Sequence, residues 1–296
     1  IKMGGLPCRR SSCQCPGLDA TETADVVAPS EPAADRVLCE LLAFIERQPT
    51  HVFEDGARYT GQWHENQRHG RGIHIEPDGT TYEGQWADDE AHGWGRLKCA
   101  DGTGYEGEWE LSRKHGVGVY LHSDGSKYMG QWKDDFQSGN GTEEWLDGAK
   151  YTGQYATGRK HGRGKYAWAD GSHFEGEFVD NDIHGTGVYA WNDGHTYDGQ
   201  WVRQQMDGRG RFTYPDGRTY EGEYRRNLKS GNGVFKWPDG REYDGQWQEG
   251  ERHGVGNWTE NCKSQIGTRW ERGKRVDSQT SKDATNAGPD RGVAKA

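Results

Sequence analysis

Histidine has the widest chemical range of the residue types in this chain, because imidazole transfers protons near neutral pH and binds metal ions. Six histidines share one repeated position, each a multiple of 23 residues from the others: His69, His92, His115, His161, His184 and His253. If every unit of 23 residues adds two strands to a sheet, neighbouring histidines lie about 9–10 Å apart. Metal–ligand bonds are about 2 Å long, so these histidines cannot share an ion. We therefore predict hydrogen bonding within hairpin loops, and no catalytic, cofactor-binding or metal site.

The amino-terminal segment offers a second chemistry, the covalent attachment of lipid. Residues 3–8 read Met-Gly-Gly-Leu-Pro-Cys, which fits N-myristoylation of Gly4 if Met3 is the initiator, although Cys8 stands where Ser or Thr is usual. Stable anchoring needs a second acyl group, because one myristoyl chain binds a membrane only marginally. The alternative is an unmodified segment of low complexity. The candidate acylation sites are Gly4, Cys8, Cys13 and Cys15.

Composition limits the classes of protein to which the chain can belong. The 296 residues include 46 Gly, 13 Trp and 14 Tyr, so the apolar material is mainly aromatic and thin β-structure is favoured over a thick aliphatic core. The formal net charge of −10 disfavours nucleic-acid binding and purely electrostatic attachment to anionic lipid. The sequence contains neither the run of about 18 apolar residues that predicts a membrane span nor an apolar signal-peptide core. We expect a cytoplasmic protein with reduced cysteines.

An internal repeat dominates the chain. The motif aromatic-x-Gly-x-aromatic begins at nine positions spaced 23 residues apart: Tyr59, Tyr82, Tyr105, Tyr128, Tyr151, Phe174, Tyr197, Tyr220 and Tyr243. A Gly-x-Gly motif follows in each unit, and an Asp-Gly pair precedes each unit. A tenth unit is degenerate, with Ile266 at the first aromatic position and Trp270 at the second. Repetition of this kind predicts a solenoid-like array.

Each unit predicts two short antiparallel strands. An Asp-Gly pair between alternating runs is typical of a hairpin with a type I′ turn, in which both central residues have positive φ. The first strand is the aromatic-x-Gly-x-aromatic segment, and the second runs from Gly-x-Gly to the next Asp-Gly pair. Consecutive units continue one meander. The predicted fold class is all-β, an elongated single-layer antiparallel β-meander with a short N-terminal helix and disordered termini.

Strand alternation predicts two unlike faces. The aromatic rings share one face with the glycines and form a trough, whereas the opposite face carries a solvated row of Gln and Glu from Gln62 to Gln246. A continuous aromatic groove can anchor a helix or peptide. The predicted partner-binding groove consists of Tyr59, Trp63, Tyr82, Trp86, Tyr105, Trp109, Tyr128, Trp132, Tyr151, Tyr197, Trp201, Tyr220, Tyr243 and Trp247.

The flanks differ from the repeat in composition. Residues 1–34 are predicted to be disordered, residues 35–48 to form an amphipathic helix, residues 49–270 to form the array, and residues 271–296 to be a disordered tail. The helix would cover the first open edge of the sheet, because exposed edges promote aggregation. The alternative is a helix that docks onto a partner.

The repeated residues resemble the MORN repeat (membrane occupation and recognition nexus), whose pattern is similar to Tyr-x-Gly-x-Trp, then His-Gly-x-Gly, then Asp-Gly. Ser138, Asp207 and Ser230 depart from the usual histidine. The resemblance implies an elongated twisted antiparallel sheet without catalytic activity. Similar arrays occur in junctophilins, in radial-spoke proteins of cilia, in cytoskeletal scaffolds and ahead of plant phosphatidylinositol-phosphate kinase domains. In those proteins they are implicated in membrane association, partner binding and self-assembly.

These observations predict a non-catalytic scaffold that binds a protein partner at a membrane, cytoskeletal or ciliary structure. They are also compatible with a homodimer. The alternative is a phospholipid-binding module that reads phosphoinositides, or a regulatory array like those of phosphatidylinositol-phosphate kinases. Basic residues that recur on the second strands would serve such a lipid site: Arg71, Arg96, Lys98, Arg163, Lys165, Arg209 and Arg211.

Overall fold

The computed structural model describes residues 48–276, and these residues form one sheet of 21 strands. The strands are β1 (Thr50–Val52), β2 (Arg58–His64), β3 (Gln67–Ile75), β4 (Thr81–Ala87), β5 (Glu90–Lys98), β6 (Gly104–Glu110), β7 (Arg113–Leu121), β8 (Lys127–Lys133), β9 (Phe136–Glu144), β10 (Lys150–Ala156), β11 (Arg159–Ala167), β12 (His173–Val179), β13 (Asp182–Ala190), β14 (Thr196–Val202), β15 (Gln205–Thr213), β16 (Thr219–Arg225), β17 (Leu228–Lys236), β18 (Glu242–Gln248), β19 (Glu251–Glu260), β20 (Lys263–Glu271) and β21 (Lys274–Arg275).

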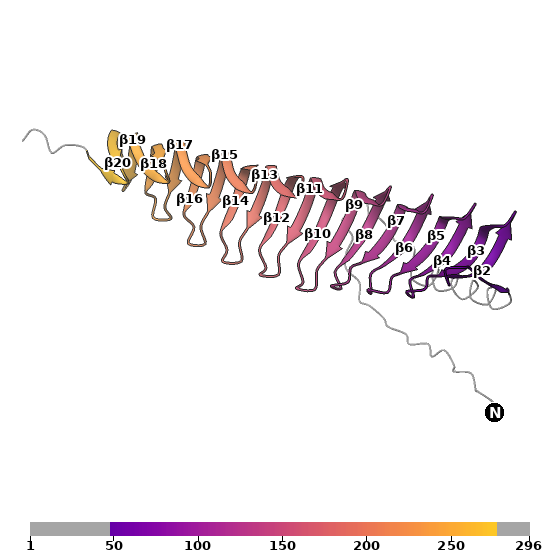
Figure 1. Cartoon of the computed structure of the whole chain (residues 1–296). Coiled ribbons are helices and arrows are strands. Elements are labelled where there is room, and N and C mark those ends of the chain that lie inside the picture. The colour runs from indigo at the N-terminus through magenta and orange to yellow at the C-terminus, as the bar shows by residue number, and fades with distance from the viewer. Residues whose placement is uncertain (1–47, 277–296) are drawn as a thin grey trace, which may run out of the picture.

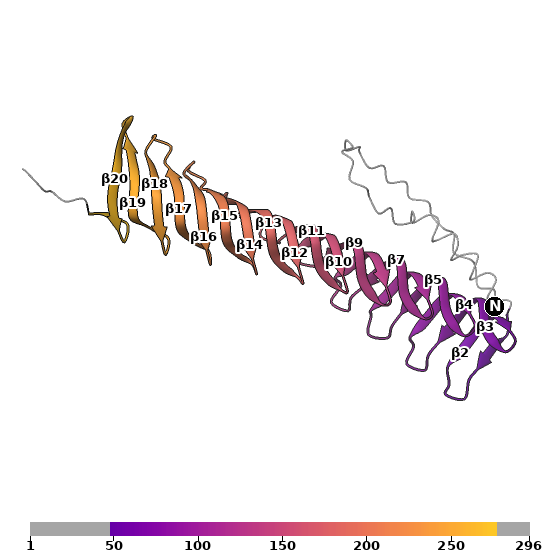
Figure 2. The same cartoon turned by 90° about the horizontal axis from the view of Figure 1, so that it is seen from above.

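Every strand pairs antiparallel with the next strand in the chain. Figures 1 and 2 show the strands following one another along an elongated, twisted ribbon, from β2 at one end to β20 at the other. The predicted all-β meander is therefore confirmed. The predicted helix at 35–48 and disordered segment at 1–34 lie outside the described residues, apart from residue 48.

Two kinds of loop alternate along the sheet. Inside a repeat, a two-residue turn joins the strands and both residues have positive φ, as at Glu65 (46°) and Asn66 (66°), which is type I′ geometry. Between repeats, the Asp-Gly loop is longer. The Gly56 N–H donates to the Phe53 carbonyl oxygen at 3.1 Å, and Gly56 has a φ of 93°. This is the geometry of a type I turn closed by one left-handed glycine.

The prediction of type I′ turns at the Asp-Gly pairs was therefore wrong, although the hairpins themselves are present. The aspartate explains the difference, because the Asp55 side chain accepts a hydrogen bond from the Ala57 N–H at 3.0 Å. Such a side-chain bond supports a loop that needs only one left-handed position. Equivalent bonds occur in the other eight Asp-Gly loops.

A pair of glycines faces each other across the two strands of each repeat. In the first repeat Gly61 lies opposite Gly72, and a Cβ atom on Gly72 would lie 2.3 Å from the hydroxyl oxygen of Tyr59. The tyrosine ring therefore lies directly on the glycine backbone, which explains why the motif contains Gly. The Tyr59 hydroxyl donates to the Gln62 carbonyl oxygen at 2.9 Å.

Beyond each glycine pair the register shifts and the second strand bulges. The Gln62 side chain fills this bulge, because its Oε1 accepts a hydrogen bond from the Arg71 N–H at 2.8 Å. A Gln or Glu makes the same contact in all nine repeats. The row that we expected only to be solvated thus satisfies backbone groups of the sheet.

The first-strand rings form one continuous core. Tyr59 meets Trp63 of its own repeat edge-to-face, with ring centroids 4.9 Å apart, and meets Trp86 of the next repeat at 5.6 Å. The Trp86 indole N–H donates to the Gly72 carbonyl oxygen at 3.2 Å. Edge-to-face pairs contribute about 0.5–1.5 kcal/mol beyond the burial of their area. Each repeat is therefore stabilised by its neighbour, as in other quasi-one-dimensional arrays.

The carboxyl-terminal end of the sheet is formed by the degenerate tenth unit. Trp270 is buried against Tyr243, at 5.3 Å between ring centroids, but Ile266 is 86% exposed and does not replace the missing ring. The sheet also continues through β21, so it extends beyond residue 270, where the array was predicted to end. Residues 277–296 lie outside the description.

Candidate functional site

The rings predicted to bind a partner lie in the core of the sheet. Thirteen of the fourteen are at most 7% exposed, and Trp63 of the first repeat is 39% exposed. These rings hold neighbouring repeats together and offer little surface to a ligand. A binding role for them remains a prediction.

A second set of rings lies on the same face and is half-buried rather than covered. It forms a row in which each ring contacts the next, with centroid distances from 4.4 to 5.9 Å. We call this set the ring row. It consists of Trp145, Tyr166, Trp168, Tyr189, Trp191, Phe212, Tyr214, Phe235, Trp237 and Trp258, of which only Phe235 is buried.

The ring row belongs to the repeats from the fourth onward. In the first three repeats the corresponding positions hold His74, Leu97 and Tyr120. The His74 ring is 3.0 Å from the Glu76 carboxylate, so polar side chains interrupt the aromatic surface there. Alternation in the sequence predicted one aromatic face, but it could not show that the rings of the second strands, and not those of the first strands, remain accessible.

A lysine lies among the rings of the row without a carboxylate partner among the described residues. The Lys229 ammonium is 4.5 Å from the centroid of Phe235, 5.6 Å from that of Tyr214 and 5.0 Å from that of Trp247. Burial, with a smaller effect of the nearby Arg218, lowers the pKa of Lys229 to about 8. A cation held in this way gains from a carboxylate brought by a ligand, because both ionised groups are then stabilised.

In the fifth repeat the residue equivalent to Lys229 is Lys160, and this lysine does have a carboxylate partner. Lys160 also lies over rings, at 4.8 Å from the centroid of Trp145, but its ammonium is 3.0 Å from the Glu143 carboxylate. Glu143 also accepts a hydrogen bond from the Tyr155 hydroxyl at 3.1 Å. Lys160 therefore provides a matched comparison for Lys229 within one chain.

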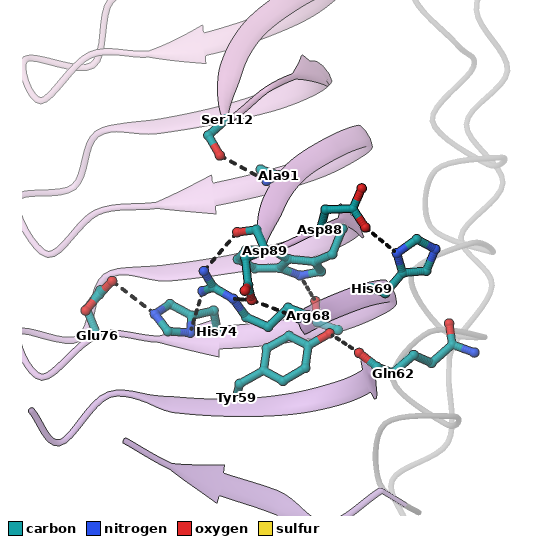
Figure 3. Close-up of polar contacts among 12 residues, drawn as sticks. Tyr59, Gln62, Arg68, His69, His74, Glu76, Asp88, Asp89, Ala91 and Ser112 are labelled. Carbon is teal, nitrogen blue, oxygen red and sulfur yellow. Dashed lines mark hydrogen bonds and ion pairs between the residues drawn. The ribbon is translucent and has the colours of Figure 1, made fainter. Parts of the chain in front are cut away.

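The first repeat places an arginine at this position. Figure 3 shows Arg68 bound to Asp89, whose carboxylate accepts from both the backbone N–H (2.8 Å) and the side-chain Nε (3.1 Å). The guanidinium lies 4.2 Å from the centroid of Trp86. This cation is satisfied by its own array, unlike Lys229.

The opposite face is polar, and some of its basic side chains form ion pairs across neighbouring strands. Arg96 is 2.7 Å from Glu106, and Lys165 is 3.6 Å from Glu175. Burial raises the pKa of Glu83, which lies on the same polar face as Glu106 and Glu175.

The polar face also contains a hollow of about 480 Å³ over the second to fourth repeats. It is lined partly by apolar side chains, including Trp94, Val117, Val119, Leu121 and Met129.

The repeated histidines lie on the second strands beside the bulges, not in hairpin loops. His115 contacts Glu110 of its own hairpin at 3.3 Å, whereas His69 contacts Asp88 in the turn of the next repeat at 3.6 Å. His115 Nδ1 makes no hydrogen bond, so the predicted side-chain hydrogen bonds within hairpins are found at none of the six histidines in the described residues. Gly4, Cys8, Cys13 and Cys15 lie outside the described residues. Within residues 48–276 no helix has the length and apolar character needed to cross a bilayer.

Comparison with protein families identifies the repeat. The profile of the MORN repeat matches nine consecutive segments, at residues 59–81, 82–104, 105–127, 128–150, 151–173, 174–196, 197–217, 220–240 and 243–259. The chain belongs to the MORN-repeat family. MORN repeats are typically non-catalytic and are consistent with a repeat scaffold. The sequences of curated proteins include no match to this MORN-repeat protein.

Solved structures resemble the MORN-repeat array only distantly. The TCP10 domain of CPAP from Danio rerio is 15% identical, with 67% of this chain and 94% of that chain aligned at a TM-score of 0.38. The TCP domain of SAS-4 (dCPAP) from Drosophila melanogaster, solved with a proline-rich motif of Ana2 (dSTIL), is 13% identical over 68% and 90% of the two chains, at a TM-score of 0.30. Virginiamycin B lyase from Staphylococcus aureus is 10% identical over 79% and 85%, at 0.17.

Proposed function

We propose that this MORN-repeat protein is a non-catalytic scaffold that binds a segment of a protein partner along the ring row. The observation that supports this proposal is the unbroken series of ring contacts from Trp145 to Trp258, in which every ring except Phe235 is partly exposed. Aromatic side chains dominate the energy of protein interfaces, because they bury a large area with few rotatable bonds. Placement of the scaffold at a membrane, cytoskeletal or ciliary structure is part of the same proposal.

Lys229 suggests the chemistry of the partner. An apolar segment covering the row would remove the remaining water around this ammonium, and an unpaired buried cation is costly. A partner that carries an Asp or Glu at this point would avoid that loss. We therefore expect an apolar segment, helical or extended, with at least one acidic side chain.

A selection experiment tests both features. The purified full chain would be used to select binders from a library of random peptides displayed on phage. We expect apolar sequences with an acidic residue, and we expect Trp168→Ser combined with Trp191→Ser to weaken the selected peptides by at least about tenfold. Lys229→Gln should weaken only the acidic peptides.

Val188→Ser is the matched control, because Val188 lies on β13 next to Tyr189 but faces away from the row and is 39% exposed. Its affinity for the peptides should equal that of the unaltered chain. Equal binding to the double tryptophan variant, or failure to enrich any peptide, would contradict the proposal. Circular dichroism would verify that all variants keep the sheet.

The phospholipid alternative has less support. Two of its seven candidate cations, Arg96 and Lys165, are paired with carboxylates of neighbouring strands. Pairing of this kind reduces attraction to anionic headgroups. Flotation of the array, residues 49–296, with vesicles that contain phosphoinositides separates the two functions. Binding to such vesicles that is sensitive to salt would favour the lipid alternative over the scaffold.

A further inference from the structure

A small cluster of metal-ligating side chains lies at the amino-terminal end of the array, away from the ring row. His64 ends β2, His69 lies on β3, and Asp88 lies in the turn between β4 and β5. One ligand atom from each lies within 4.8 Å of the others. The two imidazole centroids are 5.4 Å apart, and His69 Nδ1 is 3.6 Å from Asp88 Oδ1. Figure 3 shows His69 and Asp88 directed toward each other.

The stacking of repeats creates this cluster from residues far apart in the sequence. The turn of the second repeat lies against the start of β3, because the Asp89 N–H donates to the Arg68 carbonyl oxygen at 3.0 Å. Asp88, the first residue of that turn, is thereby placed beside His69. His64 reaches the same point from the other strand of the first hairpin. The expectation of no metal site considered only the histidines at the repeated position and overlooked His64, which is off that register.

In other repeats the aspartate equivalent to Asp88 forms an ion pair with an arginine. Asp134 lies 3.6 Å from Arg113, and Asp180 lies 3.7 Å from Arg159. The first repeat has Gln67 where these repeats have arginine. The turn aspartate beside the first repeat therefore has no Arg or Lys partner within residues 48–276.

The residue at the position of His64 also varies. It is Glu110 in the third repeat and Ala156 in the fifth. Two imidazoles and an unpaired turn carboxylate consequently occur together only in the first repeat of the described array.

We infer that His64, His69 and Asp88 form a binding site for a first-row divalent cation of the Zn²⁺ class. Zinc accepts imidazole nitrogen and carboxylate oxygen at about 2.0–2.2 Å, and tetrahedral ligands are then roughly 3.3 Å apart. All three side chains are exposed, so rotation about their own bonds can close the remaining gap. Three protein ligands leave a fourth position for water. A bound ion would join the first hairpin to the turn of the second repeat.

Calorimetric titration of the full chain with Zn²⁺ tests the site. Free thiols would first be alkylated, because cysteine thiolates bind zinc. We expect one ion per chain, and we expect His64→Ala, His69→Ala and Asp88→Asn each to weaken binding by at least about tenfold. Because these side chains are exposed, the variants should keep their circular dichroism spectra.

The fifth repeat provides both a control and a gain of function. His161→Ala removes the equivalent histidine and should leave the affinity unchanged, because Asp180 is held by Arg159 there. Ala156→His combined with Arg159→Gln should raise the stoichiometry from one ion to two. Binding that is equal in the three first-repeat variants, or absent from the alkylated chain, would overturn the inference.

Discussion

One Gln or Glu in each repeat satisfies a backbone group that the bulge leaves without a strand partner. In the second repeat, Gln85 Oε1 accepts from the Trp94 N–H at 2.7 Å. In the third repeat Glu108 makes the equivalent contact with Val117 at 3.1 Å. Either side chain serves because both carry an oxygen acceptor at the same distance from the backbone. The need for an oxygen acceptor therefore explains why this position holds either Gln or Glu in every repeat.

Substitution of Gln85 tests this role. Gln85→Ala should lower the free energy of unfolding by about 1–2 kcal/mol, because the Trp94 N–H loses its acceptor. Gln85→Glu should have a much smaller effect, since Glu occupies the same position in other repeats. Urea unfolding followed by circular dichroism would measure both. A Gln85→Ala chain as stable as the original would show that water replaces the side chain without loss.

Each hairpin depends on the contact between its glycine pair and one aromatic ring. A Cβ atom on Gly95 would lie 2.3 Å from the Tyr82 hydroxyl oxygen and 2.5 Å from its Cζ. The ring cannot move away freely, because Trp86 and Trp109 contact its two sides at 4.8 and 5.3 Å. The absence of a side chain at Gly95 is therefore a packing requirement of the hairpin.

Two alanine substitutions separate packing from backbone strain. Gly95→Ala should destabilise the protein by about 2–3 kcal/mol, because the added methyl group overpacks the core. Gly79→Ala meets no atom within 4 Å but has a φ of 92°, so only conformational strain of about 1–2 kcal/mol applies. Thermal unfolding of both variants would measure the difference. Equal losses would contradict the packing explanation.

At the scale of the whole molecule, the buried phenols are the most consistent electrostatic feature of the array. Burial raises the pKa of Tyr59, Tyr197 and Tyr243 to about 12, and it also raises the pKa of the tyrosines at the same position in the intervening repeats. The folded array thus holds a series of protonated phenols that are linked by the second aromatic ring of each motif, which is Trp, Tyr or Phe. Ionisation of one phenol would place a charge in the shared core.

We expect the array to unfold at alkaline pH. An unfolded tyrosine ionises near pH 10, so between pH 10 and about 12 the unfolded state loses protons that the folded state retains. The free energy of unfolding therefore falls over this interval and is unaffected by these groups below it. Circular dichroism and tyrosinate absorbance, recorded together, should change in one transition. Full ionisation of the tyrosines in an intact sheet would contradict this prediction.

The sequence was sufficient to predict the repeat, the strand pairing and the aromatic face. Those properties depend on local order: a period of 23 residues without insertion, alternation along each strand, and glycines at fixed positions. It also predicted a loop at every Asp-Gly pair, but not that the type I′ turns would form at residues such as Glu65 and Asn66. Asn66 tolerates positive φ but Glu65 does not favour it, so the twist of the paired strands decides the turn type.

Only the tertiary structure decided which aromatic rings are buried and which side chains of different hairpins contact one another. The full burial of Tyr59 and the partial exposure of Trp168 depend on how closely neighbouring repeats approach, because each first-strand ring is enclosed by the tryptophan or other aromatic ring of the next repeat. The lack of a partner for Lys229 and the cluster of His64, His69 and Asp88 arise in the same way. They join residues from different hairpins, and the stacking of hairpins is a property of the assembled sheet rather than of any one repeat.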